Sequence, residues 1–390
     1  MNKIQIKQKL SSEIVKVLND TILLRHHIHA EPEIADHEFS TREKILSFLE
    51  GLPLSIHPPY LGTDIVADLK GTSEEFIVLR ADIDALPLRE ETGLPYASKV
   101  NHMMHACGHD GHAAILAGTA RVLSALQKEL PVSVRFVFQP GEERVASGKK
   151  LVQKGALGAA RAAYALHGLP GLPSGMIQCR RGVYYAAGST FCITITGKGC
   201  HGSKPEEGVN PIPFAADLVN KLFSIHCTEN KKDGSVVTVC VCSAGTLSNI
   251  IPDTARIEGT VRYLEEKRGY ILEKIIREAA VQAIRGTGVE TEIQYWSDYD
   301  IPVINTDEGY ERTRNAVETF LPDNSYSDAP RPSMGNEDFA FYLQGRQGAM
   351  IGLGQGTDSP VLHNCKYNFN DRTIETGIRY FCGIVFGYIE

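Results

Sequence analysis

Three apolar segments of this chain each end beside side chains that can bind a metal ion, and this recurrence constrains the fold more than any other feature. The segments and their polar ends are 76–79 with Asp82 and Asp84, 132–138 with Glu142 and Glu143, and 162–166 with His167. Short apolar runs of this kind are typical of buried strands. In α/β proteins the carboxyl ends of such strands line the sheet edge where active sites are built. We therefore expect an α/β fold with a metal site at that edge.

Glu142 and Glu143 illustrate what one such strand end can supply. In an extended chain, adjacent side chains point to opposite sides, so one glutamate can bind a metal ion while the other faces a substrate as general base. Each strand end taken alone has an ordinary alternative: loop capping for Asp82 and Asp84, and a solvated acidic turn for the glutamates. Their recurrence at three strand ends favours a site over these alternatives.

The stretch 105–112 concentrates ligand chemistry further, with three histidines, one cysteine and one aspartate. Cys107 and His109 are two residues apart, so they cannot share one face of a helix. A helical spacing of apolar residues begins at His112, and a helix N-terminus favours a thiolate. We expect Cys107 and His109 on a loop that leads into a helix over 112–130. The alternative is a histidine-rich surface turn with a core cysteine, because Cys-x-His alone is a weak zinc signal.

The start of the chain is a charged, amphipathic segment that predicts a first helix over 1–21. Its apolar stripe and its charges differ from a signal peptide. His26, His27 and His29 follow, shortly before Pro32. We interpret these histidines as a helix end before a proline turn and not as a metal site.

Composition bounds the function. A chain of 390 residues favours two domains. Its formal net charge of −7 offers no basic field for nucleic acid, and no apolar run approaches the roughly 18 residues of a membrane span. The nine cysteines are scattered without a disulfide framework, which is typical of reduced thiols in a cytoplasm. We therefore expect a cytoplasmic protein that binds neither nucleic acid nor membrane.

The region 187–297 has a different pattern. Its predicted strands alternate apolar and polar residues, and amphipathic helices lie between them. The predicted strands are 189–196, 236–241, 254–263 and 289–296, and the predicted helices are 211–226 and 265–286. Two helices against one antiparallel sheet form a small α+β domain, here of ferredoxin-like type. We predict an α/β fold: a mixed-sheet catalytic domain over 1–186 and 298–390, which holds every candidate ligand, and an inserted α+β domain over 187–297.

Further short motifs follow one another along nearly the whole chain. Together they are Arg25…Glu33, 80–87, 107–112, 139–143, 165–168, 201–205, 245–252, 259–262, 337–339 and 362–364. Their order and spacing resemble the N-acyl-amino-acid amidohydrolases of the hippurate hydrolase, aminoacylase and auxin-conjugate hydrolase type. This branch belongs to the dimetal carboxypeptidase–aminoacylase superfamily, so the resemblance implies a catalytic domain of dizinc-exopeptidase type.

The resemblance also implies a ligand set for two divalent ions per subunit. The implied ligands are Cys107, His109, Glu143, His167 and His363. Cys107 would bridge the two ions as a thiolate. Sulfur and imidazole ligands suit zinc, cobalt or nickel, and manganese stays open because cellular supply also decides which metal is bound.

The remaining roles implied by the resemblance concern catalysis and substrate. Glu142 would be the general base. His201, Asn249 and Arg262 would bind substrate from the inserted domain, and His201 is also a candidate catalytic residue, acting in its own chain or in a partner. In relatives this domain forms the dimer, so we expect a homodimer or homotetramer with an inserted domain that serves for dimerisation or as a lid.

The chain departs from the family pattern at three positions. More distant branches have His-x-Asp where this chain has Arg80-Ala81-Asp82, so one metal ligand is missing and His109 replaces it. Asp82 keeps a catalytic role of uncertain kind. Gly141 stands where alanine is usual and Cys365 where relatives often have proline, and neither is an implied ligand.

These observations predict hydrolysis of the amide bond of N-acyl amino acids, such as acetyl or benzoyl derivatives, by a metal-bound water that Glu142 activates. Amide hydrolysis needs a strong nucleophile and a stabilised oxyanion, which metal ions supply. The alternative enzyme is a dipeptidase or aminopeptidase on the same scaffold. A non-catalytic metal-binding or acyl-amino-acid-binding protein is a further alternative, although structural zinc sites are typically closed sets of four ligands.

Overall fold

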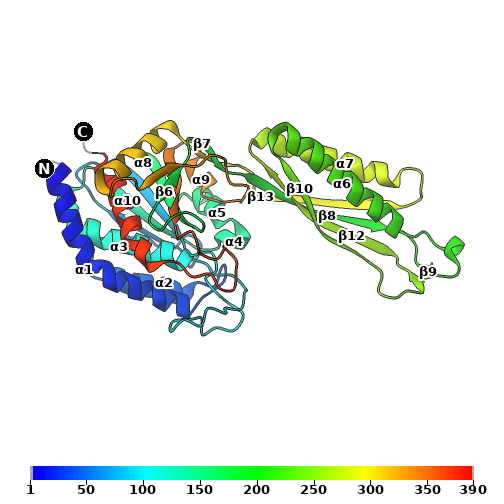
Figure 1. Cartoon of the computed structure of the whole chain (residues 1–390), viewed down its shortest axis with the longest axis horizontal. Coiled ribbons are helices and arrows are strands. Elements are labelled where there is room, and N and C mark those ends of the chain that lie inside the picture. The colour runs from blue at the N-terminus through cyan, green and yellow to red at the C-terminus, as the bar shows by residue number, and fades with distance from the viewer. Residues whose placement is uncertain (1–2, 389–390) are drawn as a thin grey trace. The chain divides into compact units, whose positions relative to one another are not determined.

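The computed structural model describes residues 3–388 and divides the chain into two compact units. Unit 1 comprises Met1–Tyr184, Val303–Arg331 and Asp338–Glu390, and unit 2 comprises Tyr185–Pro302 and Pro332–Glu337. Both units mix helices with sheet (Figure 1), so the predicted α/β class is confirmed. Met1 and Asn2, which we included in the first predicted helix, lie outside the described residues.

Unit 1 is built on an eight-stranded mixed sheet with the order β1-β2-β4-β3-β5-β16-β6-β15. Its strands are β1 (Ser55–Ile56), β2 (Ile65–Leu69), β3 (Phe76–Asp82), β4 (Ser133–Gln139), β5 (Ala162–Leu169), β6 (Ile177–Cys179), β15 (Tyr326–Asp328) and β16 (Gln347–Gly354). A separate pair is formed by β7 (Gly182–Tyr185) and β14 (Val303–Asn305).

The central strands β3, β4 and β5 are parallel, and their register brings their carboxyl ends to one edge. Asp82 lies opposite Gln139 on β4, and Arg80 lies opposite Ala165 on β5, two residues before His167. All three strands are almost entirely buried, as expected for parallel strands covered on both faces. The expectation that the three strand ends meet is therefore confirmed.

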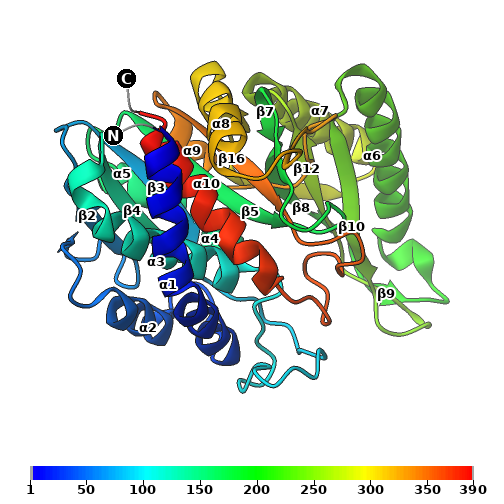
Figure 2. The ribbon, with the colours of Figure 1, turned by 60° about the vertical axis from the view of Figure 1, so that its left-hand side comes forward.

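Helices cover this sheet and fill its core. They are α1 (Lys3–Ala30), α2 (Phe39–Leu49), α3 (His109–Ala125), α4 (Glu142–Val145), α5 (Ser147–Gln153), α8 (Asp307–Phe320), α9 (Ala340–Leu343) and α10 (Ile374–Phe386), with 3-10 turns η1 (Gln127–Glu129) and η3 (Asp371–Thr373). Figure 2 shows α1 and α10 in front of β3, β4 and β5. Because α3 packs between α1 and α10, the segment that carries His109 is held on both sides.

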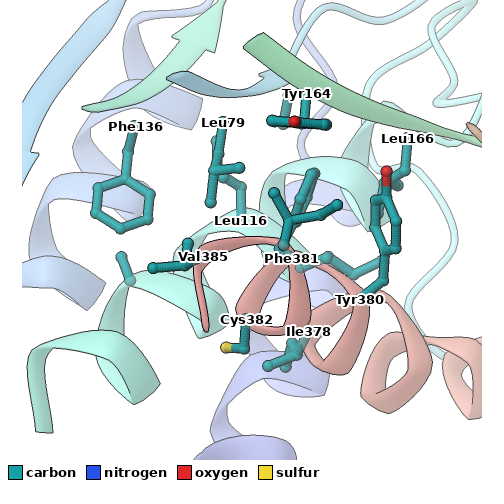
Figure 3. Close-up of a cluster of buried hydrophobic side chains, with 14 of the residues drawn as sticks. Leu79, Leu116, Phe136, Tyr164, Leu166, Ile378, Tyr380, Phe381, Cys382 and Val385 are labelled. Carbon is teal, nitrogen blue, oxygen red and sulfur yellow. The ribbon is translucent and has the colours of Figure 1, made fainter. Parts of the chain in front are cut away.

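The core of unit 1 lies between the sheet and this helix layer. Figure 3 shows Leu79, Phe136 and Tyr164 of the strands facing Phe381 and Val385 of α10. These side chains have no exposed surface. Fully burying one large apolar side chain contributes roughly 1.5–3 kcal/mol, so this core supplies a rigid base for the polar strand ends above it.

Unit 2 is a four-stranded antiparallel sheet with the order β10-β12-β8-β13. Its elements are β8 (Ala187–Thr196), β9 (Cys200–His201), η2 (Pro205–Glu207), α6 (Ile212–Asp233), β10 (Val236–Ala244), β11 (Ile250–Ile251), β12 (Thr254–Tyr263), α7 (Glu266–Ile284) and β13 (Glu290–Tyr299). Phe191, Ile193 and Ile195 of β8 alternate toward a core shared with Leu222 and Ile276 of the two helices. β9 and β11 pair in a small sheet of their own.

Several element boundaries differ from the sequence-based prediction. The first helix continues to Ala30, so His26, His27 and His29 lie inside it and do not follow it. The buried positions Leu24 and Ile28 extend its apolar stripe, and this packing continues the helix to Ala30, just before Pro32. His167 lies within β5 instead of beyond its end, because β16 continues the pairing through Gly352.

Two further features of the described residues bear on the earlier expectations. All nine cysteines are free between residues 3 and 388. In the same range, every helix is too short or too polar to cross a lipid bilayer.

Candidate metal centre

A tight turn places Cys107 and His109 at the edge of the sheet. Gly108 has φ +89°, in the left-handed region that glycine tolerates best. A Cβ atom at this position would lie 2.8 Å from the Tyr367 hydroxyl oxygen, so a side chain is excluded by space as well. The turn ends as α3 begins, so Cys107 is on the loop as predicted, whereas His109 is already the first helical residue.

His109 has one ring nitrogen held by a hydrogen bond and the other buried without a partner. Its Nδ1 donates a hydrogen bond to the Asp84 carbonyl oxygen at 2.9 Å, so Nε2 carries the lone pair. Nε2 is buried and has no hydrogen-bond partner, although it lies 3.8 Å from Asp82 Oδ2 and 4.0 Å from Glu143 Oε1. A buried, unpartnered lone pair facing carboxylate oxygens is what a divalent cation would satisfy.

His167 and Cys107 form the second part of the centre. Nδ1 of His167 donates to the Gly168 carbonyl oxygen at 2.9 Å, and its Nε2 lies 3.4 Å from Sγ of Cys107. The imidazole therefore presents the nitrogen that is free of the backbone toward the thiol. Both residues are 7% exposed, so the pair lies nearly out of contact with water.

Glu143 and His363 form the third, outer part. Nε2 of His363 lies 3.0 Å from Glu143 Oε1, and the His363 side chain is 54% exposed. The backbone N–H of His363 donates to the Ala106 carbonyl oxygen at 2.8 Å, which joins this late loop to the residue before Cys107. His363 has φ +62°, an uncommon conformation for a residue with a side chain, and the contact with Glu143 is made in this conformation.

Asp84 positions both glutamates. Its two carboxylate oxygens accept the backbone N–H groups of Glu142 at 3.0 Å and Glu143 at 3.1 Å. A carboxylate at the first turn of a helix is stabilised by the free N–H groups there. Glu142 and Glu143 therefore begin the short helix α4 instead of lying in extended chain, which corrects our expectation. Asp84 had no role in the set of site residues implied by the resemblance, although its place in Asp-x-Asp after a buried strand was a usable signal.

The five implied ligands form one connected set. Their possible ligand atoms lie within 4.8 Å of one another in overlapping groups: Cys107 with His109 and His167, Cys107 with Glu143 and His363, and His109 with Glu142 and Glu143. Cys107 belongs to two of these groups.

The carboxylates of this set shift the pKa values of Cys107 and His109 in the direction expected where positive charge is lacking. Burial raises the pKa of the Cys107 thiol well above its usual value, and Glu143 and Glu142 raise it further. Burial alone would lower the pKa of His109, but Asp82 and Asp84 reverse this and raise it to about 10. The carboxylates thus favour positive charge at His109, and a divalent cation at Nε2 would supply that charge in place of a proton. The expected thiolate at Cys107 is not obtained from the helix N-terminus alone.

Asp82 and His112 also lie beside His109, but their polar atoms are engaged elsewhere. His112 Nε2 accepts the Gly168 backbone N–H at 2.8 Å, and His112 Nδ1 donates to Asp82 Oδ1 at 2.6 Å. Arg80 Nη1 donates to Asp82 Oδ2 at 2.7 Å. Burial alone would raise the pKa of Asp82, and the neighbouring His109, His112 and Arg80 outweigh it, so that pKa is well below its usual range.

His201, Asn249 and Arg262 belong to unit 2 and do not form one cluster there. His201 on β9 lies opposite Ile250, and the Asn249 carbonyl oxygen accepts the Gly202 N–H at 2.7 Å. Arg262 lies near the far end of β12, opposite Gly188. Thr254 and Arg262 are separated by roughly 26 Å along the strand. Unit 2 therefore brings the backbones of His201 and Asn249 together and places Arg262 near the other end of β12.

Comparisons with known proteins identify the family of this chain. Residues 78–386 match the model of peptidase family M20/M25/M40. N-acetylcysteine deacetylase of Bacillus subtilis is 33% identical, over 95% of this chain and 97% of its own. Hippurate hydrolase of Campylobacter jejuni is 30% identical, over 98% of this chain and 100% of its own. The crystal structure of the Bacillus subtilis YXEP protein, described as a dinuclear metal-binding peptidase, has a TM-score of 0.81 and 31% identity, with 95% and 98% of the two chains covered.

The buried parallel strands and the cluster of imidazole, thiol and carboxylate groups define a metal-dependent hydrolase of amide bonds, and the relatives are enzymes of this kind. The chain belongs to peptidase family M20/M25/M40. The resemblance to N-acyl-amino-acid amidohydrolases is therefore confirmed at the level of the family.

Proposed function

We propose that this enzyme hydrolyses the amide bond of N-acyl amino acids and releases a carboxylic acid and a free amino acid. The observation that carries the proposal is the buried, unpartnered Nε2 of His109 among carboxylate oxygens and a thiol. Relatives along the full length of the chain are named for deacetylation of N-acetylcysteine and for hydrolysis of hippurate. Both names describe substrates that are N-acyl amino acids.

Cys107, His109, Glu143, His167 and His363 would hold two divalent ions. Thiol and imidazole groups suit zinc, cobalt or nickel, and Glu143 also suits manganese. Divalent ions bound there supply Lewis acidity, which polarises the substrate carbonyl and lowers the pKa of water from 15.7 toward roughly 7. The Asp84 carbonyl, which fixes the ring of His109, has the role that outer partners of ligating histidines commonly have.

Glu142 is the general base in this proposal. Its backbone is fixed by Asp84 and its side chain is 7% exposed, so the carboxylate is oriented and largely shielded from water. Glu142 takes a proton from the attacking water as the new C–O bond forms. It then gives that proton to the nitrogen of the leaving amine as the C–N bond breaks. General base catalysis of this kind typically contributes about 10² to 10⁴ in rate.

Unit 2 would bind the substrate and join two chains. The fork of Arg262 can pair in a bidentate manner with the free carboxylate of an acyl amino acid. Asn249 precedes Thr254 and His201 follows its partner Thr196, so both are next to the Thr254 end of β12 in the chain. Arg262 lies roughly 26 Å from Thr254 along that strand, which is longer than a small acyl amino acid. We therefore infer that Arg262 and His201 at one site come from different chains of a homodimer, with 187–297 as the dimerisation domain.

A substrate screen tests the proposal. The protein is loaded in turn with zinc, manganese, cobalt or nickel and is incubated with N-acetyl, N-benzoyl and long-chain acyl amino acids and with dipeptides. We expect free amino acid from at least one acyl series, with kcat/KM above that for any dipeptide. Faster release from dipeptides would replace the proposal with a peptidase. A metal-loaded protein that is inert to every compound would favour a binding protein.

A further inference from the structure

Arg80 is a buried cation at the point where the sheet meets the metal centre. Its Nε donates to Gln139 Oε1 at 2.9 Å, its Nη1 to Asp82 Oδ2 at 2.7 Å, and its Nη2 to Asp338 Oδ1 at 2.9 Å. The side chains of Arg80, Asp82 and Asp338 have no exposed surface. Removing one partner of a buried charge pair leaves the other charge without compensation, so these carboxylates depend on Arg80.

Asp82 is connected through His112 to β5, the strand that carries His167. Because the Gly168 N–H donates to His112 Nε2, His112 must hold its proton on Nδ1, and that proton is donated to Asp82 Oδ1. The Gly168 N–H belongs to the peptide bond that joins it to His167. His112 also lies one turn after His109 on α3. The chain Arg80–Asp82–His112 therefore ties both His109 and His167 to β3.

We propose that Arg80 and His112 are positioning residues. Arg80 is an internal counter-ion that keeps the Asp82 carboxylate out of direct metal coordination. His112 is a brace that sets the distance between His109 and His167. Asp82 Oδ2 lies only 3.8 Å from His109 Nε2, so without Arg80 it would be a ready oxygen ligand. With Arg80 in place, the centre keeps sulfur and imidazole as its dominant ligands. This inference rests on the proposed ligand set.

Arg80→Met tests the counter-ion. Removing the guanidinium frees the Asp82 oxygen for a metal ion, and oxygen favours manganese over zinc relative to sulfur and nitrogen. We expect the ratio of the manganese to the zinc Kd, measured by competition with a chelator, to fall about tenfold, which is within the range for outer partners of metal ligands. Arg80→Lys, which keeps the charge, should stay near the wild-type ratio.

Arg135→Met is the matched control. Arg135 lies on the neighbouring β4, is 8% exposed and forms a two-pronged pair with Asp68 at 2.7 Å through each nitrogen. Its loss should lower Tm without changing the ratio of the two Kd values. If Arg80 were purely structural, Arg80→Met would also leave the ratio of the two Kd values unchanged, with the binding of both metals weakened alike. That result would overturn the counter-ion assignment.

His112→Asn tests the brace, the part of the proposal that stays testable if Arg80→Met fails to fold. The Asn amide can still donate to Asp82, but it is too short to accept the Gly168 N–H. We expect zinc binding to weaken by about tenfold or more with the manganese-to-zinc ratio unchanged. Wild-type zinc affinity in this variant would overturn the brace. These readouts need no substrate, so a wild-type protein that binds zinc but hydrolyses no acyl amino acid would sink the proposed function alone.

Discussion

At the scale of single residues, burial decides the chemistry of the centre. The sequence places Cys107 just before a helix, where the dipole favours a thiolate. In the fold the thiol is 7% exposed and faces Glu143 and Glu142, and burial together with these carboxylates raises its pKa. A thiolate at Cys107 would therefore depend on a bound cation, and local sequence could not reveal this because the glutamates come from a different strand end.

The reactivity of Cys107 should report this dependence. With metal bound, ligation occupies the sulfur lone pair, so we expect alkylation of Cys107 to slow by about tenfold or more compared with chelator-treated protein. The measurement is peptide mass spectrometry after timed exposure to iodoacetamide.

Cys240 is the internal control for this experiment, because it is exposed on β10 in unit 2. Its alkylation rate should be the same with and without metal. Equal rates at Cys107 in the two samples would remove this residue from the proposed ligand set.

At the scale of elements, hydrophobic pattern predicted most of the fold. The predicted strand 254–263 coincides with β12, and the helices predicted over 211–226 and 265–286 correspond to α6 and α7. The three strand ends that carry candidate ligands do meet at one edge, because parallel strands share their direction. Hydrophobic periodicity and apolar content are local properties of the sequence. They can be recognised without knowing which elements pack against one another.

What the pattern missed depends on partners far away in the sequence. The strands β2, β6, β14 and β15 are too short for an alternation of apolar and polar residues to be recognised in the sequence. Each is stabilised by pairing with another strand. The helix at Glu142 forms where Asp84, 58 residues earlier, accepts its N–H. Arg80 reads as a missing ligand in the sequence, whereas its contacts with Asp82 and Asp338 become visible only in the fold.

At the scale of the whole molecule, the proposed site needs residues from unit 1 and from two separated places in unit 2. The length of β12 between Thr254 and Arg262, roughly 26 Å, is the reason for proposing that His201 and Arg262 of one chain serve different sites. A twofold dimer resolves this, because each chain can offer His201 to its partner while using its own Arg262. The expected active unit is therefore the dimer.

Mixing two inactive variants tests this arrangement. In a dimer of one His201→Ala chain and one Glu142→Gln chain, one of the two sites has both wild-type residues if His201 acts in trans. After subunit exchange at equal amounts, we expect activity to return to about one quarter of wild type, because about half of the dimers are mixed.

The matched control mixes Glu142→Gln with Cys107→Ala, whose defects lie in the same unit. Every site of that mixed dimer keeps one defect, so no activity should return. Absence of recovery in the first mixture, with exchange and metal content verified, would assign His201 to its own chain or to no catalytic role.

The measurement that tests the central claim most directly is the metal content and kcat of Glu142→Gln, determined on the same sample. If the metals are held by Cys107, His109, Glu143, His167 and His363 and Glu142 is the base, the variant should bind as much metal as wild type. Its kcat should fall by at least about 10²-fold. Loss of metal together with activity would make Glu142 a ligand, and wild-type kcat with full metal content would contradict its role as the base.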